Sequence, residues 1–557
     1  MRPFLIMVMA LCALLALPVL GVLGSWLNPD PAAWATLAHQ WNTVLPEYAA
    51  QSAGLALGVA LGVTLLGAGA AAAVTLFEFP LRRSFEWALL LPLAMPAYVL
   101  AYVYTDALQY SGPAQMRLRS LLGLEGALWP DVRSAPAAVL LFVLALYPYV
   151  YLLTRTALAE RGVQMMEAAR LLGAGLWRRI VEVALPLSRP AIVAGVALAL
   201  METLADYGVA SFFGLNTFAA GIYKAWLALN DAVAATQLAG VLLLVVGGLL
   251  WMEHRAQRRL RFAATRASGA HTQDARPVRL RGLPAAVAFI LCAVPVVLGF
   301  IVPMLLLLRL LLIELRYSEF GWPLASFQLW AWNSFRLAAL AAALCVALAL
   351  ALAFVQRMQA SEKGGAASGL RALARLVSLG YAVPGGVIAV GILLPVAWIQ
   401  VHAPQWQLPA WITGTVLGVL YAYVVRFSAV ALQSVEAGYA RVPASIDDTA
   451  RLLGSGPWRV WHELHFPLLR RNTIAAALLV FVDVMKELPA TLLLRPFNSD
   501  TLAVVAYNLA RDERLGEAAL PSLAIVLVGL VPVVLLTRAL REPQLAPPAG
   551  IEPASSA

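Results

Sequence analysis

The sequence predicts an all-α polytopic membrane protein in which about twelve transmembrane helices form two parallel six-helix repeats. Two observations carry this prediction. Of the 557 residues, 61% are hydrophobic and 13% are charged, whereas soluble domains have about 45–50% apolar and about 25% charged residues. In addition, a long motif of the first half recurs in the second. The composition alone excludes an ordinary soluble domain.

Twelve apolar runs are long enough, or nearly so, to cross a bilayer, which takes about 20 helical residues. They lie at about 4–24, 52–77, 88–108, 135–155, 190–210, 237–252, 283–313, 335–356, 376–400, 411–431, 473–494 and 518–537. The sixth run is short and the seventh long for one crossing, so we expect either to be tilted, broken or partly interfacial. The first run could be a cleaved signal peptide, but no small-residue cleavage site clearly ends it, and we favour a retained helix.

Basic residues gather in alternate loops, which is the bias that orients membrane proteins. With the N-terminus in the cytoplasm, the arginine-rich loops all lie inside, whereas the outer stretches 25–51 and 401–410 contain no Lys or Arg. This predicts a multi-pass membrane protein with both termini in the cytoplasm. The net charge of +10 then reflects topology and contact with anionic membrane lipid, and no nucleic-acid partner is expected.

The repeat and the charge pattern together predict four segments. We expect a first half at 1–252 with helices one to six and a coupling loop at 160–190, a basic cytoplasmic linker at 253–282, a second half at 283–541 with helices seven to twelve and a coupling loop at 440–472, and a disordered cytoplasmic tail at 542–557.

The internal repeat is strongest in these two loops. Glu167-Ala-Ala-Arg-Leu-Leu-Gly173 matches Asp448-Thr-Ala-Arg-Leu-Leu-Gly454 at an offset of 281 residues, and the match continues without a gap as far as Arg189 and Arg470. A second echo pairs residues 216–223 with 500–507. Because an even number of crossings separates the copies, the halves are parallel, unlike those of inverted-repeat carriers.

Each loop motif reads as a short helix, a glycine stop and a second helix. Glu167 and Asp448 are expected near the helix start, where the macrodipole favours a carboxylate, and Gly173 and Gly454 in the left-handed conformation that ends a helix. Small residues allow close approach of another backbone: Ala168, Ala169, Thr449 and Ala450. These are features of a docking element; the alternative is an interfacial hairpin that serves only topology.

The pattern from Glu167 to Pro186, repeated from Asp448 to Pro467, resembles the cytoplasmic "EAA" loop of binding-protein-dependent ABC importer permeases. The segments 91–102, 201–208 and 486–496 resemble the subgroup of fused two-half ferric-iron permeases. The resemblance implies a MetI-like permease fold, alternating access, and a coupling helix in each loop that docks on an ATPase. It also implies two ATPase copies and a periplasmic substrate-binding protein as partners, and the bacterial inner membrane as the location. The second copy departs from the pattern at Asp448 and Thr449, so its contacts are expected to differ.

Charged residues within two apolar runs form the candidate pathway: Glu202, Asp206, Asp483, Lys486 and Glu487. The repeat pairs Glu202 with Asp483 and Asp206 with Glu487. Each such charge costs roughly 2.5–3.5 kcal/mol at the bilayer centre, so these side chains must face protein or water. Either the acids line a route for a hard cation, or Lys486 neutralises a neighbouring acid and the remainder are hydrogen-bonded between helices. We weigh the second interpretation somewhat above the first.

Several chemistries are absent from the sequence. No G-x-x-x-x-G-K-[ST] loop is present, so ATP must be hydrolysed by separate subunits; the chain is expected to be no enzyme and to hold no cofactor. The three cysteines and six histidines show no firm metal-site spacing, and His462 and His465 read as surface residues. The expected cargo is ferric iron, with thiamine or an organic phosphonate as alternatives and an ion-gradient-driven secondary carrier as the rival class.

Overall fold

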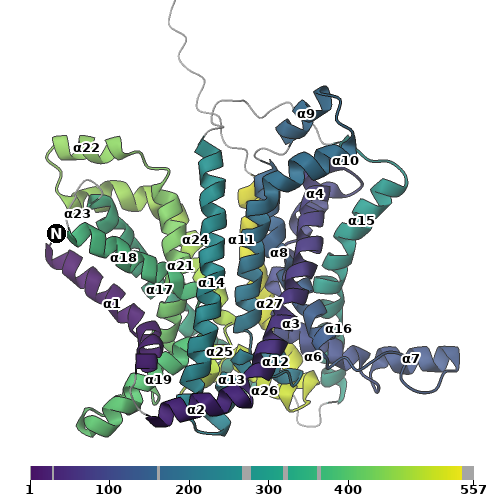
Figure 1. Ribbon diagram of the computed structural model, residues 1–557, viewed down its shortest axis with the longest axis horizontal. Coiled ribbons are helices and arrows are strands. Elements are labelled where there is room, and N and C mark those ends of the chain that lie inside the picture. The colour runs from purple at the N-terminus through teal and green to yellow at the C-terminus, as the bar shows by residue number, and fades with distance from the viewer. Residues whose placement is uncertain are drawn as a thin grey trace, which may run out of the picture.

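The structure is a computed structural model that describes residues 2–27, 31–159, 163–265, 278–317, 324–359 and 365–541. Over these residues it is a bundle of long helices (Figure 1). Of the predicted segments, residues 266–277 of the linker and the whole tail at 542–557 lie outside the described residues.

The described residues up to 265 form fourteen α-helices. They are α1 (Arg2–Gly24), α2 (Pro31–Asn42), α3 (Leu45–Val63), α4 (Gly69–Leu76), α5 (Arg82–Ala88), α6 (Ala97–Leu108), α7 (Pro113–Leu122), α8 (Ala135–Ala157), α9 (Val163–Leu171), α10 (Leu176–Arg179), α11 (Leu185–Ala205), α12 (Gly208–Phe212), α13 (Phe218–Tyr223) and α14 (Ala232–Thr265).

The described residues from 278 onward form thirteen further helices. They are α15 (Leu283–Val296), α16 (Val302–Tyr317), α17 (Leu324–Met358), α18 (Gly365–Leu379), α19 (Gly385–His402), α20 (Leu408–Ile412), α21 (Leu417–Tyr439), α22 (Ala444–Leu452), α23 (Pro457–Val460), α24 (Phe466–Met485), α25 (Pro489–Leu494), α26 (Leu502–Arg511) and α27 (Leu515–Arg541). Two short strands, β1 (Phe77–Glu78) and β2 (Val278–Arg279), pair in parallel.

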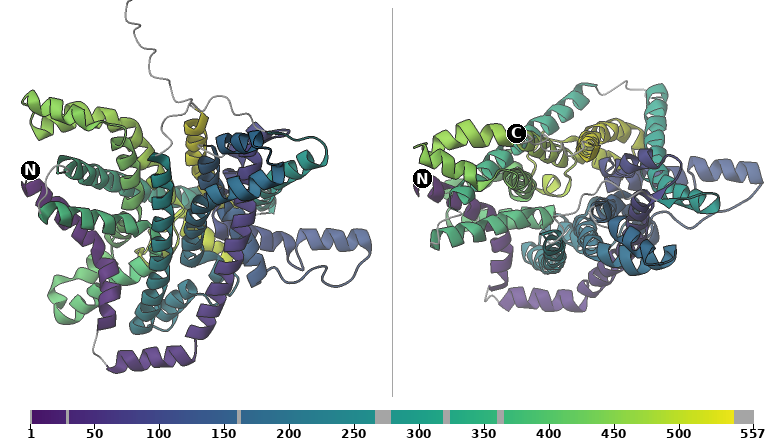
Figure 2. Two further views of the ribbon diagram at one scale, coloured as in Figure 1. Left: turned by 45° about the horizontal axis from the view of Figure 1, so that its top comes forward. Right: turned by 90° about the horizontal axis from the view of Figure 1, so that it is seen from above.

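The all-α membrane fold is confirmed. Among the described residues, ten helices are long and apolar enough to span a membrane, or eleven if one bent pair is counted as a span. Seen from above, the helices near the middle of the bundle appear nearly end-on, whereas several at its periphery are tilted or lie lengthwise (Figure 2).

Five of the twelve predicted runs are not continuous helices. The fifth is interrupted between Ala205 and Gly208, the ninth between Leu379 and Gly385 and the tenth between Ile412 and Leu417. The third and eleventh break beside a proline.

The third run is bent by 89° between Ala94 and Ala97, where Met95 is extended before Pro96. The eleventh stops at Met485 and restarts at Pro489 as α25. Proline disfavours the helical conformation in the residue before it, which accounts for the extended Met95 in the third run. In the eleventh run Leu488 keeps helical angles, and Pro489 instead begins α25, where its missing amide costs little.

The sixth and seventh runs also differ from expectation. The sixth, predicted to be short, lies in the 34-residue α14, which extends into the predicted linker as far as Thr265. The seventh forms one 35-residue candidate span, Leu283–Tyr317, with a π-helical turn at Val297–Ile301. π-turns insert an extra residue without ending a helix, so the long run is bulged rather than broken.

Helix α1 packs against two helices of the second half of the chain, α18 and α19 (Figure 1). Tyr421 on α21 donates a hydrogen bond to the carbonyl of Leu14 at 2.5 Å. A Cβ at Gly391 would lie 2.2 Å from the Pro18 carbonyl, so this glycine permits the close contact of α1 with α19. The contacts support a retained first helix, which stays a prediction.

Candidate functional site

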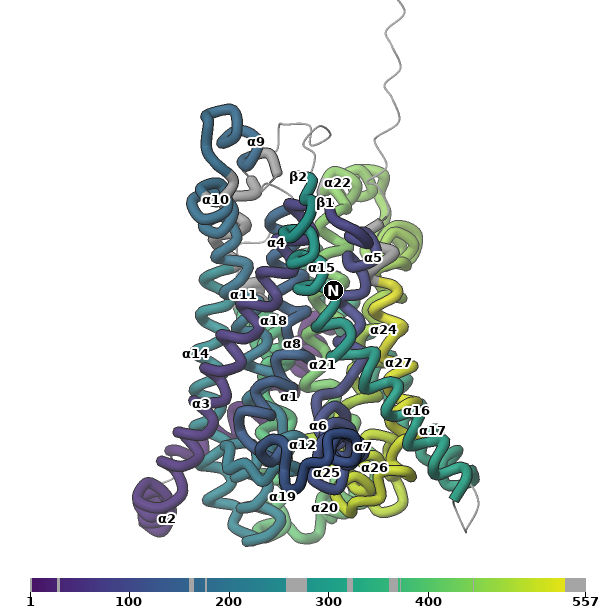
Figure 3. Tube along the Cα trace, turned by 90° about the vertical axis from the view of Figure 1, so that its right-hand side faces the viewer, coloured from purple at the N-terminus to yellow at the C-terminus, as the bar shows by residue number. Residues whose placement is uncertain are grey.

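Two surface loops with the same geometry protrude from one end of the molecule: α9 with α10, and α22 with α23 (Figures 1 and 3). Gly173 and Gly454 have φ of 81° and 76°, a left-handed conformation that costs glycine little. The amides of Ala174 and Ser455 each donate to a carbonyl five residues earlier at 3.0 Å, which closes a Schellman turn. The predicted helix, glycine stop and second helix are confirmed in both copies.

An exposed apolar ridge runs along both loops. Its members are 79–88% exposed: Leu171, Leu172, Leu452 and Leu453. Beside this ridge, Ala168 and Thr449 are exposed, Ala169 is half-buried and Ala450 is buried. Exposed leucines next to small side chains form an apolar surface of the kind that a partner protein covers.

The predicted placement of the loop carboxylates is wrong. Glu167 and Asp448 are each the fifth residue of their helix, beyond the first turn. Both are partnered within the helix, Glu167 by Arg170 at 3.5 Å and Asp448 by Arg451 at 3.9 Å. The acid in the first turn of α22 is Asp447. The helices begin earlier than the motif suggested, so the macrodipole does not explain these two carboxylates.

All five candidate pathway residues line one cavity of about 140 Å³ between the two halves: Glu202, Asp206, Asp483, Lys486 and Glu487. The remaining lining comes mainly from α6, α8, α11, α21 and the segments around the helix breaks. Sequence reasoning therefore brought the right residues together, although it left open whether they pair or line a route.

The second acid of each pair caps a half-helix. Asp206 follows the end of α11, and its carboxylate accepts the amide of Val209 at 2.7 Å, in the first turn of α12. Glu487 lies at the equivalent break, where it accepts the amides of Ala490 and Thr491 at 2.9 and 3.0 Å in α25. Since helix starts leave amides unpaired, Asp206 and Glu487 stabilise the breaks as well as line the cavity.

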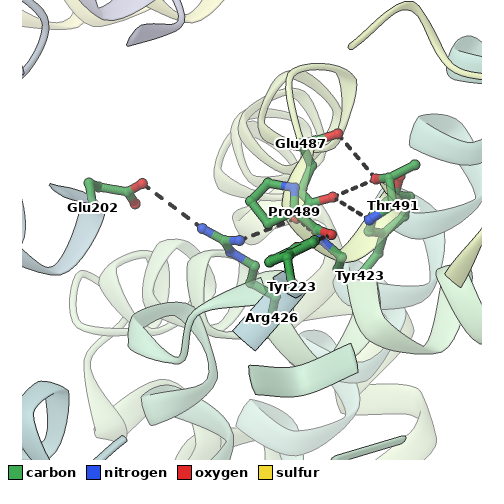
Figure 4. A network of polar contacts seen from close by, with 8 residues as sticks. Glu202, Tyr223, Tyr423, Arg426, Glu487, Pro489 and Thr491 are labelled. Atoms are coloured by element: carbon green, nitrogen blue, oxygen red, sulfur yellow. Dashed lines mark hydrogen bonds and ion pairs between the residues drawn. The ribbon is translucent and has the colours of Figure 1, made fainter. Parts of the chain in front are cut away.

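Arg426 on α21 is the cation at the centre of the network and was missed in the sequence. Its Nη1 lies 3.3 Å from Glu487 Oε1 and its Nη2 3.9 Å from Glu202 Oε2 (Figure 4). Glu202 belongs to the first half and Arg426 to the second, so this pair joins the halves. An arginine inside the apolar run at 411–431 was a sufficient signal, because intramembrane charges are rare.

The remaining charges pair locally. Lys486 Nζ lies 2.9 Å from Asp483 Oδ1, as the neutralising interpretation predicted, whereas Glu487 turns to Arg426 instead. Four carboxylates and two cations therefore line the cavity, a formal charge of −2. Three tyrosines add phenolic oxygens to the wall: Tyr98, Tyr149 and Tyr381.

A second polar cavity of about 60 Å³ lies on the side toward α9 and α22. It shares Tyr149, Glu202, Tyr381 and Arg426 with the first cavity. Its other lining residues include Glu253, near the α9/α22 end of α14. The Arg426–Glu202 contact thus lies where the two cavities adjoin. Both cavities are located between the two halves.

Among the described residues, no group of three His, Cys, Asp or Glu side chains is placed to hold a metal ion. The expectation that His465 is a surface residue is wrong. Its side chain is fully buried and its Nε2 lies 2.8 Å from Asp447 Oδ1. Spacing alone did not reveal this because the partner comes from the preceding loop helix.

A membrane-spanning helical bundle with a polar cavity between two similar halves and matching loops at one end has the structure of a transport permease. The chain belongs to the family of binding-protein-dependent transport system inner membrane components, which matches residues 63–259 and 368–541. The predicted family is confirmed, and membership sets aside the secondary-carrier alternative. The protein is a multi-pass permease of the ABC importer class rather than an enzyme.

Three relatives illustrate the similarity. The Fe(3+)-transport system permease protein FbpB 2 of Haemophilus influenzae is 24% identical over 504 residues, which cover 86% of this chain and 87% of the relative. The putative 2-aminoethylphosphonate transport system permease protein PhnV of Salmonella typhimurium is 28% identical over 208 residues, 37% of this chain and 74% of the relative. The molybdenum transport system permease protein ModB of Escherichia coli K12 is 32% identical over 138 residues, 25% of this chain and 58% of the relative.

Proposed function

We propose that the protein is the permease subunit of an ATP-driven importer, in which α9 and α22 each dock one copy of a separate ATPase. The main support is that both loops share one geometry, lie at the same end and expose leucine ridges. Two protruding loops of the same geometry suit two copies of one partner. A periplasmic binding protein then delivers cargo at the opposite end.

The end with α9 and α22 lies in the cytoplasm in this proposal. The aromatic ring of Phe4 in α1 packs edge-on against Trp458 in α23, with centroids 5.3 Å apart, which supports an N-terminus at the same end. The proposed limits of the halves remain 1–252 and 283–541, joined by the basic linker at 253–282.

Ferric iron is the proposed cargo. The cavity carries a formal charge of −2, and its carboxylate and phenol oxygens suit a hard cation. The full-length similarity to a Fe(3+)-transport permease points the same way. Oxyanions such as a phosphonate or molybdate are the second candidates, because permeases named for them are also similar. An excess of acids disfavours them. Thiamine, which is itself a cation, is the other alternative.

Glu202 and Asp483 form the proposed polar route. Their repeat partners Asp206 and Glu487 cap helices, whereas Glu202 and Asp483 are held by the cationic side chains of Arg426 and Lys486. Replacing both with their amides, Glu202→Gln with Asp483→Asn, is expected to reduce iron uptake several-fold while the complex still assembles. Uptake of radiolabelled iron into proteoliposomes measures this effect. Uptake equal to that of the unmodified protein would reject the route.

The cargo is tested by ATP hydrolysis in the complete importer, reconstituted with its ATPase and binding protein in lipid nanodiscs. Iron-loaded binding protein is expected to stimulate hydrolysis severalfold over the empty form. Stimulation by phosphonate- or molybdate-loaded binding protein, with none by the iron-loaded form, would replace the cargo assignment. No stimulation by any loaded binding protein would contradict the importer function itself.

A further inference from the structure

The first coupling helix is attached to its half by a small apolar cluster. Its four residues come from four different segments and are 1–5% exposed: Leu76, Leu158, Met166 and Ala184. Met166 lies on α9, and Ala184 directly precedes α11. Met166 therefore inserts from the loop helix into a pocket formed by the transmembrane helices.

The second half replaces all four members of this cluster with polar residues at the repeat offset of 281. The equivalent residues are Arg357, Tyr439, Asp447 and His465. Asp447 lies on α22, at the position of Met166, and it is buried, with 5% of its surface exposed. Each coupling helix, α9 or α22, is thus attached to its half by a joint, meaning a cluster of four side chains at equivalent positions. The joint is apolar in the first half and polar in the second.

The polar joint is hydrogen-bonded throughout. Asp447 accepts from Arg357 Nε at 2.6 Å and from His465 Nε2 at 2.8 Å, and Arg357 also donates to the Val442 carbonyl at 2.9 Å. The Tyr439 hydroxyl lies 3.2 Å from His465 Nδ1. A neutral histidine with its proton on Nε2 satisfies both contacts. Burial raises the pKa of Asp447, but the hydrogen bonds from His465 and Arg357 outweigh it and hold this pKa below its usual value.

The joint connects the loop to the cavity. His465 ends the π-turn from which α24 begins, and the other end of α24 carries Asp483 and the break at Lys486 and Glu487. A 20-residue helix is about 30 Å long. A single helix, α24, therefore links α22 to the cavity. The Asp447–His465 contact attaches the start of this helix to α22.

We propose that Asp447 is the positioning residue that couples α22 to α24, and that it does so through an ionic joint whose counterpart in the first half is apolar. The inference rests on the proposed docking of an ATPase on α22. The two halves then receive the ATPase movement through unlike joints, and loss of charge pairing affects only the second.

The test compares single and complete replacements in the reconstituted importer. Asp447→Met leaves the buried His465 and the half-buried Arg357 without their carboxylate acceptor. It is expected to lower transport per ATP hydrolysed at least several-fold while the ATPase still co-purifies. The swap of all four residues to their first-half equivalents is expected to restore transport per ATP to within about twofold of the original. The swapped residues are Arg357→Leu, Tyr439→Leu, Asp447→Met and His465→Ala.

A second pair of variants keeps the test decisive if Asp447→Met does not fold. His465→Gln retains an amide donor toward Asp447 and is expected to stay coupled, whereas His465→Ala is expected to uncouple. Normal coupling in Asp447→Met would overturn the proposal, as would normal coupling in His465→Ala where Asp447→Met does not fold. A four-residue swap that remains as uncoupled as the single change would also overturn it. Failure of the unmodified permease to co-purify with the ATPase would instead contradict the proposed function.

Discussion

Replacing Glu167 and Asp448 together with lysine is expected to abolish co-purification of the ATPase and to lower ATP-driven uptake by about tenfold or more, since like charges in an interface cost several kcal/mol and each 1.4 kcal/mol is about tenfold. Both carboxylates lie beside the exposed leucine ridges. Their own pairs with Arg170 and Arg451 are solvent-exposed, and such pairs contribute only about 0–1 kcal/mol to stability. The loss would therefore report a partner rather than unfolding.

Glu517→Lys is the matched control for this charge reversal. Glu517 pairs with Arg514 at the same three-residue spacing, with oxygen and nitrogen 2.6 Å apart, but at the opposite end of the molecule. Its reversal is expected to leave co-purification of the ATPase near that of the unmodified protein. If the double reversal at Glu167 and Asp448 behaved like this control, neither loop would be the docking surface.

Arg426→Gln is expected to destabilise the permease by about 3–5 kcal/mol, because removing one partner of a buried ion pair leaves an uncompensated charge. Arg426 is only 8% exposed and contacts Glu487 and Glu202. Glu487 would keep its contacts to α25 but lose its cationic partner. The ion pair between Glu202 and residue 426, which joins the halves, would also be lost. Thermal unfolding of the purified protein in detergent measures the change.

Lys486→Gln provides the comparison for Arg426. Its pair with Asp483 also lines the cavity, but the lysine side chain is 32% exposed, so water compensates part of the lost charge. A smaller loss of stability than for Arg426→Gln is expected. Equal losses for the two variants would mean that burial does not distinguish them and that Arg426 has no special role between the halves.

Much of the fold and site could be predicted because the sequence repeats. Two copies of one loop motif at an offset of 281 residues identified both protruding loops, with α9 and α22, and the same offset paired Glu202 with Asp483. Repetition is informative here since each copy must satisfy the same local geometry, such as the left-handed Gly173 and Gly454.

The failures share a physical origin. Composition marks which segments are apolar, but it does not show where a proline or a capping acid interrupts a helix. The runs that break at Pro96 and Pro489 were therefore predicted as continuous spans. Partners distant in sequence were also missed, among them Arg426 with Glu202 and His465 with Asp447. Only the folded arrangement brings these groups together.

The central claim is that α9 and α22 each contact a separate ATPase, and cysteine cross-linking tests it most directly. The three native cysteines, Cys12, Cys292 and Cys345, are all buried, which leaves a low background. Single cysteines at Ala168 and at Thr449 are predicted to cross-link to the ATPase with a short bifunctional reagent, whereas one at the fully exposed Phe497, at the opposite end, is not. Cross-linking at Phe497 with none at Ala168 or Thr449 would contradict the account.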